Sequence, residues 1–226
     1  MSRQGRCLGL IGGLGPAATV YYYRGLIAAH AKAGFTPRML IAHADVDHGR
    51  PMAEANDLDG LAHYLNGFID QLASGGAEMT AIVAITPHIC AAQLVKLSRL
   101  PLIDMVSEVD AAVRAKGWKR IGLFGTKSTV GSKMFGRLGV DVVMPKPDEI
   151  ERIHNAYLDV VYDRNTPKTV DDLRALAHTL MTRDGAEAVL LAGTDLSTVM
   201  NEENAGFPTL DCAGVHIAAI TKRLTA

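Results

Sequence analysis

The chain has 226 residues, with 23 lysines and arginines against 24 aspartates and glutamates, and a formal net charge of -1. It therefore lacks the basic excess that nucleic-acid and membrane-surface binding require, and we expect neither partner. Hydrophobic residues make up 48% and charged residues 21%, as in a soluble globular chain, and three widely spaced cysteines fit neither a disulfide framework nor a zinc knuckle.

Strand-like apolar runs alternate with helical patterns along the chain. Residues 1–6 are polar, and glycines interrupt the apolar run after them, which predicts a cytoplasmic protein without a signal peptide or membrane span. Strands are expected at 7–11, 39–42, 80–85, 100–105, 120–124, 140–144, 188–191 and 207–210, with helices at 17–32 and 58–74 and a polar loop after residue 42. Such alternation indicates βαβ units with parallel sheets, so the predicted fold class is α/β.

Three short patterns occur twice in the same order. Gly-Leu-Ile-Gly at 9–12 returns as Gly-Leu-Phe-Gly at 122–125, and Gly-Ala-Glu at 76–78 returns at 185–187. An apolar stretch with proline second and aspartate fifth occurs at 100–104 and again at 207–211. The repeat predicts two pseudo-symmetric parallel-sheet α/β domains with the active site in the cleft between them. The expected domains are 1–104 with 212–226, and 105–211.

A glycine-rich turn lies where the first strand leads into the first helix. Gly13-x-Gly15-x-x-Ala18 satisfies a loose dinucleotide fingerprint. The acidic residue expected about 20 positions further on is absent, since Asp45 and Asp47 come much later. A turn followed by proline also exposes backbone N–H groups to any small anion. We therefore favour a carboxylate near Gly13 and Gly15, with a dinucleotide as the alternative.

Hydroxyl side chains follow the buried strands of both halves. Thr86 is expected to cap a helix that begins at Pro87, which a purely structural role would also explain. At the carboxyl end of a parallel strand the same groups form an anion pocket. Thr194 and Asp195 occupy the equivalent place in the second half, so the two threonines are predicted to flank one ligand. The stretch that contains Thr126, Ser128 and Thr129 is predicted to line the same site.

The segment after the second strand contains His43, Asp45 and Asp47 in alternation, which raises a metal site as one possibility. Alternation on an exposed strand end gives the same pattern without a metal, and we expect none. Arg50, in the loop Gly-Arg-Pro, is a candidate guanidinium clamp for a substrate carboxylate, although a solvated arginine would look the same. His154 and His216 lie within helical patterns and are expected to be partly buried.

In order and spacing, these motifs resemble the aspartate/glutamate racemase family, the cofactor-independent amino-acid racemases. The resemblance covers nearly the whole chain. It rests on residues 9–16, Tyr22-Tyr23-Arg24, Thr86-Pro87-His88, Gly125-Thr126, Thr194-Asp195, and Asp211 with His216. It implies two α/β domains, a small acidic amino acid or carboxylate as ligand, and inversion at the α-carbon without pyridoxal phosphate or another cofactor. It also implies a homodimer.

The family's chemistry uses two proton carriers on opposite faces of the α-carbon, usually cysteines. The resemblance places Ala84 and Gly193 at those two positions, and neither side chain can carry a proton. The asparagine usual before the first threonine is Ile85. The candidate substitutes are His88, Asp195, Cys90 and Cys212, the last at a helix entry where a lowered thiol pKa is expected.

The function predicted from sequence is therefore that of a racemase-family protein that moves a proton at an α-carbon with non-standard groups. The alternatives are a lyase or decarboxylase reaction on a related carboxylate, and a non-catalytic amino-acid-binding pseudoenzyme. The predicted substrate-binding residues are Gly13, Gly15, Arg50, Thr86, Pro87, Thr126, Ser128, Thr129 and Thr194.

Overall fold

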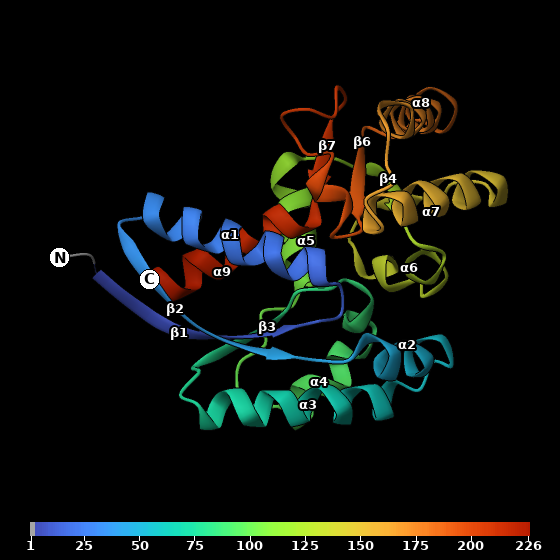
Figure 1. Cartoon of the computed structure of the whole chain (residues 1–226). Coiled ribbons are helices and arrows are strands. Elements are labelled where there is room, and N and C mark those ends of the chain that lie inside the picture. Colours follow the sequence, from blue (N-terminus) through green and yellow to red (C-terminus); the bar gives the residue numbers. More distant parts are fainter. Residues whose placement is uncertain (1–2) are drawn as a thin grey trace. The chain divides into compact units, whose positions relative to one another are not determined.

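The computed structural model describes residues 3–226 and divides into two compact units (Figure 1). Unit 1 contains the chain up to Met105 together with His216–Ala226, and unit 2 is Val106–Val215. Each unit has one parallel sheet with helices on both faces, which confirms the predicted α/β class. No helix within residues 3–226 is long and apolar enough to cross a membrane.

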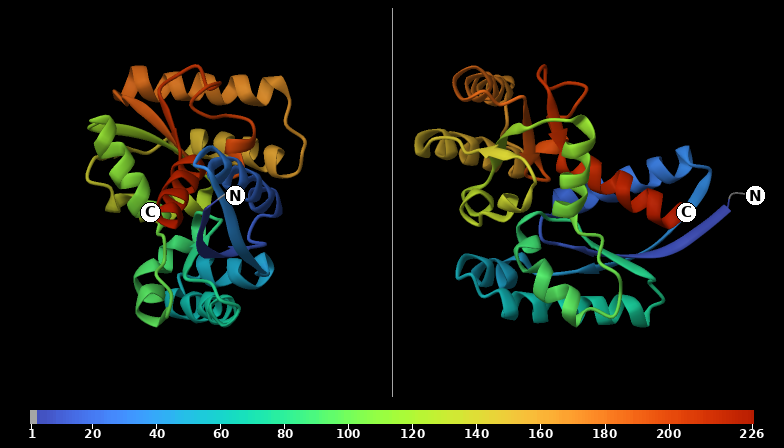
Figure 2. Two further views of the ribbon diagram at one scale, coloured as in Figure 1. Left: turned by 90° about the vertical axis from the view of Figure 1, so that its left-hand side faces the viewer. Right: turned by 180° about the vertical axis from the view of Figure 1, so that it is seen from behind.

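In unit 1 the sheet has the order β2-β1-β3. Helices α1 and α9 cover one face, and α2, α3 and α4 cover the other (Figure 2). The strands are β1 (Arg3–Gly12), β2 (Phe35–His43) and β3 (Met79–Ile82). The helices are α1 (Pro16–Lys32), α2 (Val46–Glu54), α3 (Leu58–Ser74), the short 3-10 helix η1 (Thr86–Cys90), α4 (Ala91–Leu97) and the part of α9 from His216 onward.

In unit 2 the sheet has the order β5-β4-β6-β7. Helices α7 and α8 cover one face and α5 the other. The strands are β4 (Arg120–Gly125), β5 (Asp141–Val143), β6 (Ala188–Ala192) and β7 (Thr209–Asp211). The helices are α5 (Met105–Lys116), α6 (Lys127–Gly131), η2 (Met134–Arg137), α7 (Pro147–Val161), α8 (Pro167–Asp184), η3 (Leu196–Thr198) and α9 (Cys212–Thr225).

The sequence repeat corresponds to a repeat in strand register. Leu8 of β1 pairs with Met79 of β3, and the residues at the matching repeat positions pair in unit 2, Ile121 of β4 with Ala188 of β6. In each unit the first strand therefore lies between the second and the third. Parallel strands in this order place the ends of β1 and β3, and of β4 and β6, side by side at one edge of each sheet.

The repeated Gly-Ala-Glu motif has a structural role at the amino ends of the sheets. Glu78 Oε2 accepts a hydrogen bond from the Cys7 N–H at 2.6 Å. Glu187 Oε2 accepts bonds from the N–H groups of Lys119 at 2.5 Å and Arg120 at 3.1 Å. These backbone donors lower the pKa of Glu187 because they stabilise its charged form. Each glutamate joins the first strand of its sheet to the third.

Two expected elements differ in kind, and the strand expected at 80–85 ends at Ile82. The strand predicted at 100–105 is reduced to a single parallel bridge between Thr80 and Leu102, and α5 already begins at Met105. The polar loop predicted after residue 42 is mostly the helix α2. The Asp45 side chain caps this helix by accepting a hydrogen bond from the Asp47 N–H at 2.9 Å. The alternation of polar residues there therefore marks a helix start.

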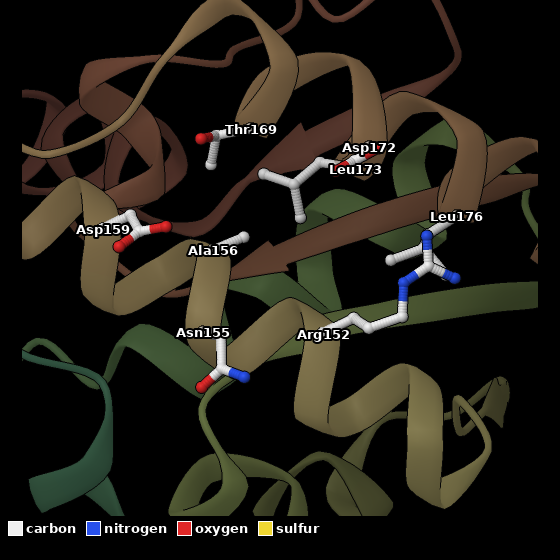
Figure 3. A pocket seen from close by; sticks show the side chains of 8 residues that line it. All are labelled: Arg152, Asn155, Ala156, Asp159, Thr169, Asp172, Leu173 and Leu176. Carbon is white, nitrogen blue, oxygen red and sulfur yellow. The ribbon is translucent and has the colours of Figure 1, made fainter.

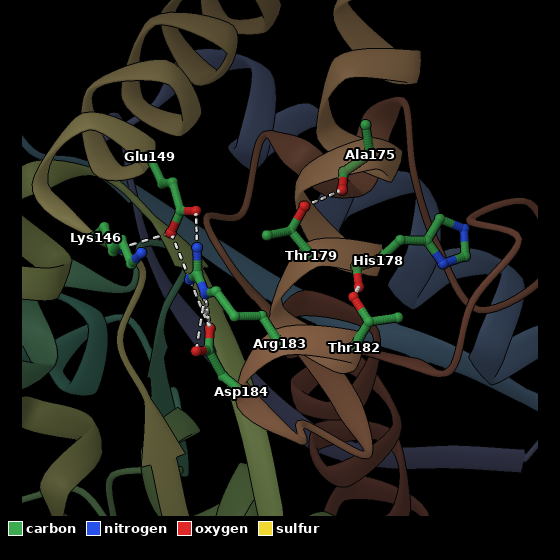
Figure 4. Close-up of polar contacts among 8 residues, drawn as sticks. All are labelled: Lys146, Glu149, Ala175, His178, Thr179, Thr182, Arg183 and Asp184. Atoms are coloured by element: carbon green, nitrogen blue, oxygen red, sulfur yellow. Dashed lines mark hydrogen bonds and ion pairs between the residues drawn. The ribbon is translucent and has the colours of Figure 1, made fainter.

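An ion-pair network joins the start of α7 to the end of α8 in unit 2 (Figure 4). Arg183 donates to both carboxylate oxygens of Glu149, at 2.5 and 3.0 Å, and also pairs with Asp184. Hydrogen bonds from the Arg183 guanidinium lower the pKa of Glu149. Since Glu149 is nearly buried and forked bonds of this kind are strong, the network fixes the two helices against each other.

Candidate functional site

The turn between β1 and α1 depends on a glycine at position 13. Gly13 has φ +84, and a Cβ there would collide with the Ala44 carbonyl oxygen. The Gly13 N–H donates to Thr19 Oγ1 at 3.0 Å, and that hydroxyl donates to the Gly15 carbonyl at 3.0 Å. Gly15, the residue before α1, has no side chain with which to cap the helix, whose first turn contains no acidic residue. The positive end of α1 therefore suits an anion.

The segment after β3 begins with Val83 and continues with Ala84, which is almost fully buried. The expectation that Thr86 caps a helix starting at Pro87 is wrong: η1 begins at Thr86 itself, and Ile85 occupies the position before it. Thr86 is half-buried, and Pro87 is buried. The Thr86 hydroxyl is consequently not used as a cap.

His88 is fully buried and held by acceptors on both sides of its ring. Its Nδ1 lies 2.9 Å from Asp104 Oδ1, and its Nε2 lies 3.4 Å from the carbonyl oxygen of Ile82. Asp104 comes at the start of the connection into α5, and its side chain is 12% exposed. The imidazole is therefore bound within the interior of unit 1.

His216 of α9 lies beside His88, with ring centroids 5.9 Å apart. Its Nε2–H donates to the Ile103 carbonyl at 2.8 Å, so its Nδ1 accepts from the Tyr22 hydroxyl at 3.1 Å. Burial, followed by electrostatic repulsion from the neighbouring His88 imidazole, lowers the pKa of His216 to about 3. His216 is thus a neutral core histidine at ordinary pH, more deeply buried than the sequence suggested.

In unit 2, hydrogen bonds between Thr126 and Thr129 hold the turn after β4. Thr126 Oγ1 accepts from the Thr129 N–H at 3.1 Å and lies 3.0 Å from Thr129 Oγ1, so Thr126 caps α6. Thr129 is buried, whereas Ser128 is exposed. The predicted site stretch thus places three hydroxyl groups at the carboxyl end of β4, of which Ser128 is the accessible one.

The segment after β6 runs through Gly193, Thr194 and Asp195, all of which are buried. A Cβ at Gly193 would lie 2.8 Å from Cε2 and 3.0 Å from Cδ2 of Tyr157, which is on α7. The Tyr157 hydroxyl donates to Asp195 Oδ2 at 2.5 Å. Burial raises the pKa of Tyr157, and so does the Asp195 carboxylate, so the phenol stays protonated. The aromatic ring fills the space that a side chain at position 193 would need.

Sequence reasoning missed Tyr157. The available signal was helical spacing, because Glu149, Ile153 and Val160 are the buried residues of α7, and Tyr157 lies on the same face of the helix. That pattern predicts a core position. It gives no indication that the hydroxyl reaches Asp195.

Asp211, at the end of β7, is a further buried carboxylate of unit 2. It accepts a hydrogen bond from Ser197 Oγ at 2.5 Å, and from the N–H groups of Ala213 at 2.9 Å and Gly214 at 3.1 Å. These bonds hold the first turn of α9. Ser197 with Asp211 thus parallels His88 with Asp104, because in each unit the short helix after the third strand contacts the aspartate of the repeated motif.

All three cysteines are buried. Cys90 Sγ is directed to the Pro87 carbonyl at 3.2 Å, and burial raises the pKa of this thiol to about 12. The lowered pKa expected for Cys212 is wrong, since burial, together with the Asp211 carboxylate, raises it well above its usual range. The interior of the protein removes the water that would stabilise a thiolate, and this outweighs the helix start.

Arg50 lies on α2 and not in the predicted loop. Its guanidinium is exposed and donates to Asp47 Oδ1 at 2.6 Å. Because Asp45 caps α2 and Asp47 pairs with Arg50, the alternating acidic residues have structural partners. Within residues 3–226 no group of three or more His, Cys, Asp or Glu side chains is arranged to hold a metal ion.

A groove of about 220 Å³ runs between α7 and α8 (Figure 3). Its walls carry side chains of both charges on the surface of unit 2. The lining residues are Arg152, Asn155, Ala156, Asp159, Thr169, Asp172, Leu173 and Leu176. None of the site residues predicted from the sequence lines this groove, so we assign it no part in the site.

The chain matches a known protein family over most of its length. A family model described as Asp/Glu/Hydantoin racemase matches residues 11–220, so the protein belongs to that family. The resemblance seen in the sequence is thereby confirmed at the level of the family.

Solved structures share the fold. A candidate Asp/Glu racemase from Yersinia pestis has a TM-score of 0.86 and 22% identity, covering 98% of this chain and 100% of that one. An aspartate racemase homologue from Pyrococcus horikoshii has a TM-score of 0.85 and 23% identity with the same coverage. The Picrophilus torridus aspartate racemase has a TM-score of 0.76 and 21% identity, covering 96% of this chain and 94% of that one. At these identities the structures establish a common fold.

Proposed function

We propose that this protein binds a small acidic amino acid or a related carboxylate and moves the proton at its α-carbon without pyridoxal phosphate or another cofactor. The observation that best supports this proposal is the turn between β1 and α1. In this racemase-family chain, Gly13 and Gly15 precede a helix start that no side chain caps, which suits an anion. Threonines follow β3, β4 and β6 at the carboxyl ends of the sheets, where α/β proteins bind ligands. A homodimer in the cytoplasm, as expected from the sequence, stays a prediction.

In the proposed reaction no cysteine thiol carries the proton. By resemblance, Ala84 and Gly193 stand where the family places its proton-carrying cysteines. Cys90 and Cys212 do not replace them, because both thiols are buried and their pKa values are raised. Among the candidate substitutes, His88 is bound to Asp104 in the interior. Asp195 is also nearly buried and bound to Tyr157, but it lies only two residues from position 193, and for that reason it is the substitute that we favour.

The direct test of the proposed function is exchange of the α-hydrogen in heavy water. We expect the wild-type protein to introduce deuterium at the α-carbon of at least one acidic amino acid, as measured by proton NMR. A thermal-shift screen with the same ligands should show stabilisation, because a ligand that binds only the folded state raises the melting temperature. Stabilisation without exchange would identify an amino-acid-binding pseudoenzyme. Neither effect with any small carboxylate at millimolar concentration would refute the proposal.

We propose Arg50 as a surface contact for a ligand carboxylate. To make this contact, the guanidinium would have to give up its ion pair with Asp47. Because the guanidinium is exposed, we expect Arg50→Ala to weaken ligand binding by about 1 kcal/mol, the upper end for exposed ion pairs. Arg99→Ala is the matched control, since Arg99 forms a comparably exposed pair with Asp70. Equal affinities of both variants in calorimetric titration would remove Arg50 from the site.

A lyase or decarboxylase reaction is the second candidate. The observation that favours it is the inequality of the two strand ends: Asp195 follows Gly193 closely, whereas the nearest titratable side chain after Ala84 is the fully buried His88. One proton carrier is sufficient for decarboxylation or elimination, while rapid inversion needs two. Chromatography of the products on a chiral column separates these outcomes.

A further inference from the structure

The contact between Gly193 and Tyr157 identifies what has taken the place of a side chain at position 193. The Tyr157 ring lies where a Cβ would be, at 2.8 Å, which is closer than real Cβ atoms approach carbon. The ring cannot easily withdraw, because its hydroxyl is bonded to Asp195 and α7 packs against β4. The position of the Tyr157 ring therefore requires a glycine at position 193.

The same contact joins the tyrosine to the neighbouring carboxylate. Asp195 is 4% exposed, and Tyr157 donates a 2.5 Å hydrogen bond to one of its oxygens. A hydrogen bond donated to a carboxylate favours its charged form and fixes its orientation. A carboxylate fixed in orientation at the carboxyl end of a strand, where α/β proteins bind ligands, can serve as a general base.

We propose that Asp195 is the catalytic base of this protein and that Tyr157 is its positioning residue, an inference that rests on the proposed function. The Asp195 carboxylate takes the α-proton as the C–H bond breaks, and the electron pair remains on the substrate as a carbanion delocalised into its carboxylate. The protonated Asp195 then returns a proton to the same carbon and recovers its charge. Tyr157 keeps its own proton throughout and donates its hydrogen bond to Asp195 in both states.

A single base has a consequence for stereochemistry. The proton leaves and returns through one carboxyl group, so it reaches the face of the α-carbon from which it came. Solvent exchange of the protonated Asp195 introduces deuterium before inversion can occur. We therefore expect deuterium incorporation in heavy water to be faster than racemisation of the same amino acid.

The test compares four variants with the wild type by α-hydrogen exchange, ligand affinity and melting temperature. Asp195→Asn should lower the exchange rate at least roughly a hundredfold, the usual contribution of a general base, while acidic ligands still bind. Tyr157→Phe keeps the ring over Gly193 and loses only the hydroxyl, so it should stay folded with a melting temperature lowered by a few degrees, retain KM and lower kcat on the order of tenfold. Asp159→Asn and Tyr162→Phe, the same substitutions at exposed positions on or beside α7, should exchange at the wild-type rate.

The outcomes separate the two proposals. Wild-type exchange that survives in folded Asp195→Asn overturns the assignment of the base and leaves the proposed function intact. Where Asp195→Asn does not fold, Tyr157→Phe decides, because a wild-type kcat in this variant also overturns the assignment. No exchange by the wild type with any acidic amino acid overturns the proposed function, and the assignment with it.

Discussion

The segments that follow the third strand of each sheet, 84–88 in unit 1 and 193–197 in unit 2, are the most instructive comparison in the molecule. Each begins with a residue that has almost no side chain and contains a threonine, which starts the short 3-10 helix in unit 1 and comes two residues before it in unit 2. Each helix directs one side chain to the aspartate of the repeated motif, His88 to Asp104 and Ser197 to Asp211. The two segments therefore have a similar backbone arrangement.

The chemistry of the two segments differs because different helices pack against them. In unit 2, α7 brings Tyr157 over Gly193 and onto Asp195. In unit 1 the polar groups are directed inward, where His88, His216 and Tyr22 form a buried set with Asp104. The comparison shows how one repeated scaffold can hold a pair of imidazoles in one copy and a tyrosine-bound carboxylate in the other.

The largest expected effect is loss of stability when the buried set of unit 1 is broken. His88→Ala removes a fully buried side chain and leaves Asp104 without its imidazole partner, so we expect about 3 kcal/mol of destabilisation in urea unfolding. Ser197→Ala in unit 2 should cost only about 1 kcal/mol, because Asp211 keeps two backbone donors. Equal costs would show that the two backbone donors to Asp211 do not compensate for the lost hydroxyl.

The next expected effect is a loss of folding stability in acid that depends on His216. Its pKa in the folded protein, about 3, lies below the ordinary histidine value, so between about pH 6.5 and 3 the unfolded chain binds the additional proton. Stability should therefore fall as the pH decreases through this window, by roughly 2 kcal/mol between pH 6.5 and 5 from this group. The ring faces His88 and Tyr22, with the charges of Asp104 and Arg223 also acting on it.

His216→Gln provides the comparison for this pH dependence, because glutamine does not titrate and retains polar atoms. Its stability, followed by chemical denaturation at each pH, should decline less steeply over the same window. An identical slope in both proteins would contradict the assignment of the acid sensitivity to His216.

A smaller effect distinguishes the two family cysteine positions. Gly193→Cys should destabilise the fold by about 1–3 kcal/mol because its side chain meets the Tyr157 ring. Ala84→Cys replaces a side chain that already has a Cβ and should cost less than about 1.5 kcal/mol. In a Tyr157→Ala background the added cost of Gly193→Cys should largely disappear, which a double-mutant cycle measures as coupling. Additive costs would mean that the ring does not restrict position 193.

Much of this fold could be predicted from the sequence, because its signals are local and repeated. The buried run at 188–191 and the Gly-Ala-Glu repeat each correspond to a definite place in a sheet. The helix α2 was missed because Asp45 reads equally well as a strand end or as a helix cap. The bridge at Leu102 falls short of a strand because pairing depends on the partner strand and not on the apolar run itself.

The candidate site was less predictable, because its decisive contacts join residues far apart in the chain. Tyr157 and Asp195 are 38 positions apart, and neither helical period nor motif spacing connects them. The pKa of Cys212 was misjudged because a helix start favours a thiolate only where the thiol is not buried, and Cys212 is fully buried. A contact between distant parts of the chain decided the first case, and burial of the side chain decided the second.

The central claim is proton transfer at an α-carbon without any cysteine, and the most direct measurement uses the protein with Cys7, Cys90 and Cys212 all replaced by alanine. These are the three cysteines of the chain, and all are buried. The measurement is α-hydrogen exchange of an acidic amino acid in heavy water, with the melting temperature as the check on folding. We predict that the folded cysteine-free protein exchanges at a rate close to that of the wild type. Loss of exchange in a folded cysteine-free protein would contradict the claim and return the chemistry to a thiol.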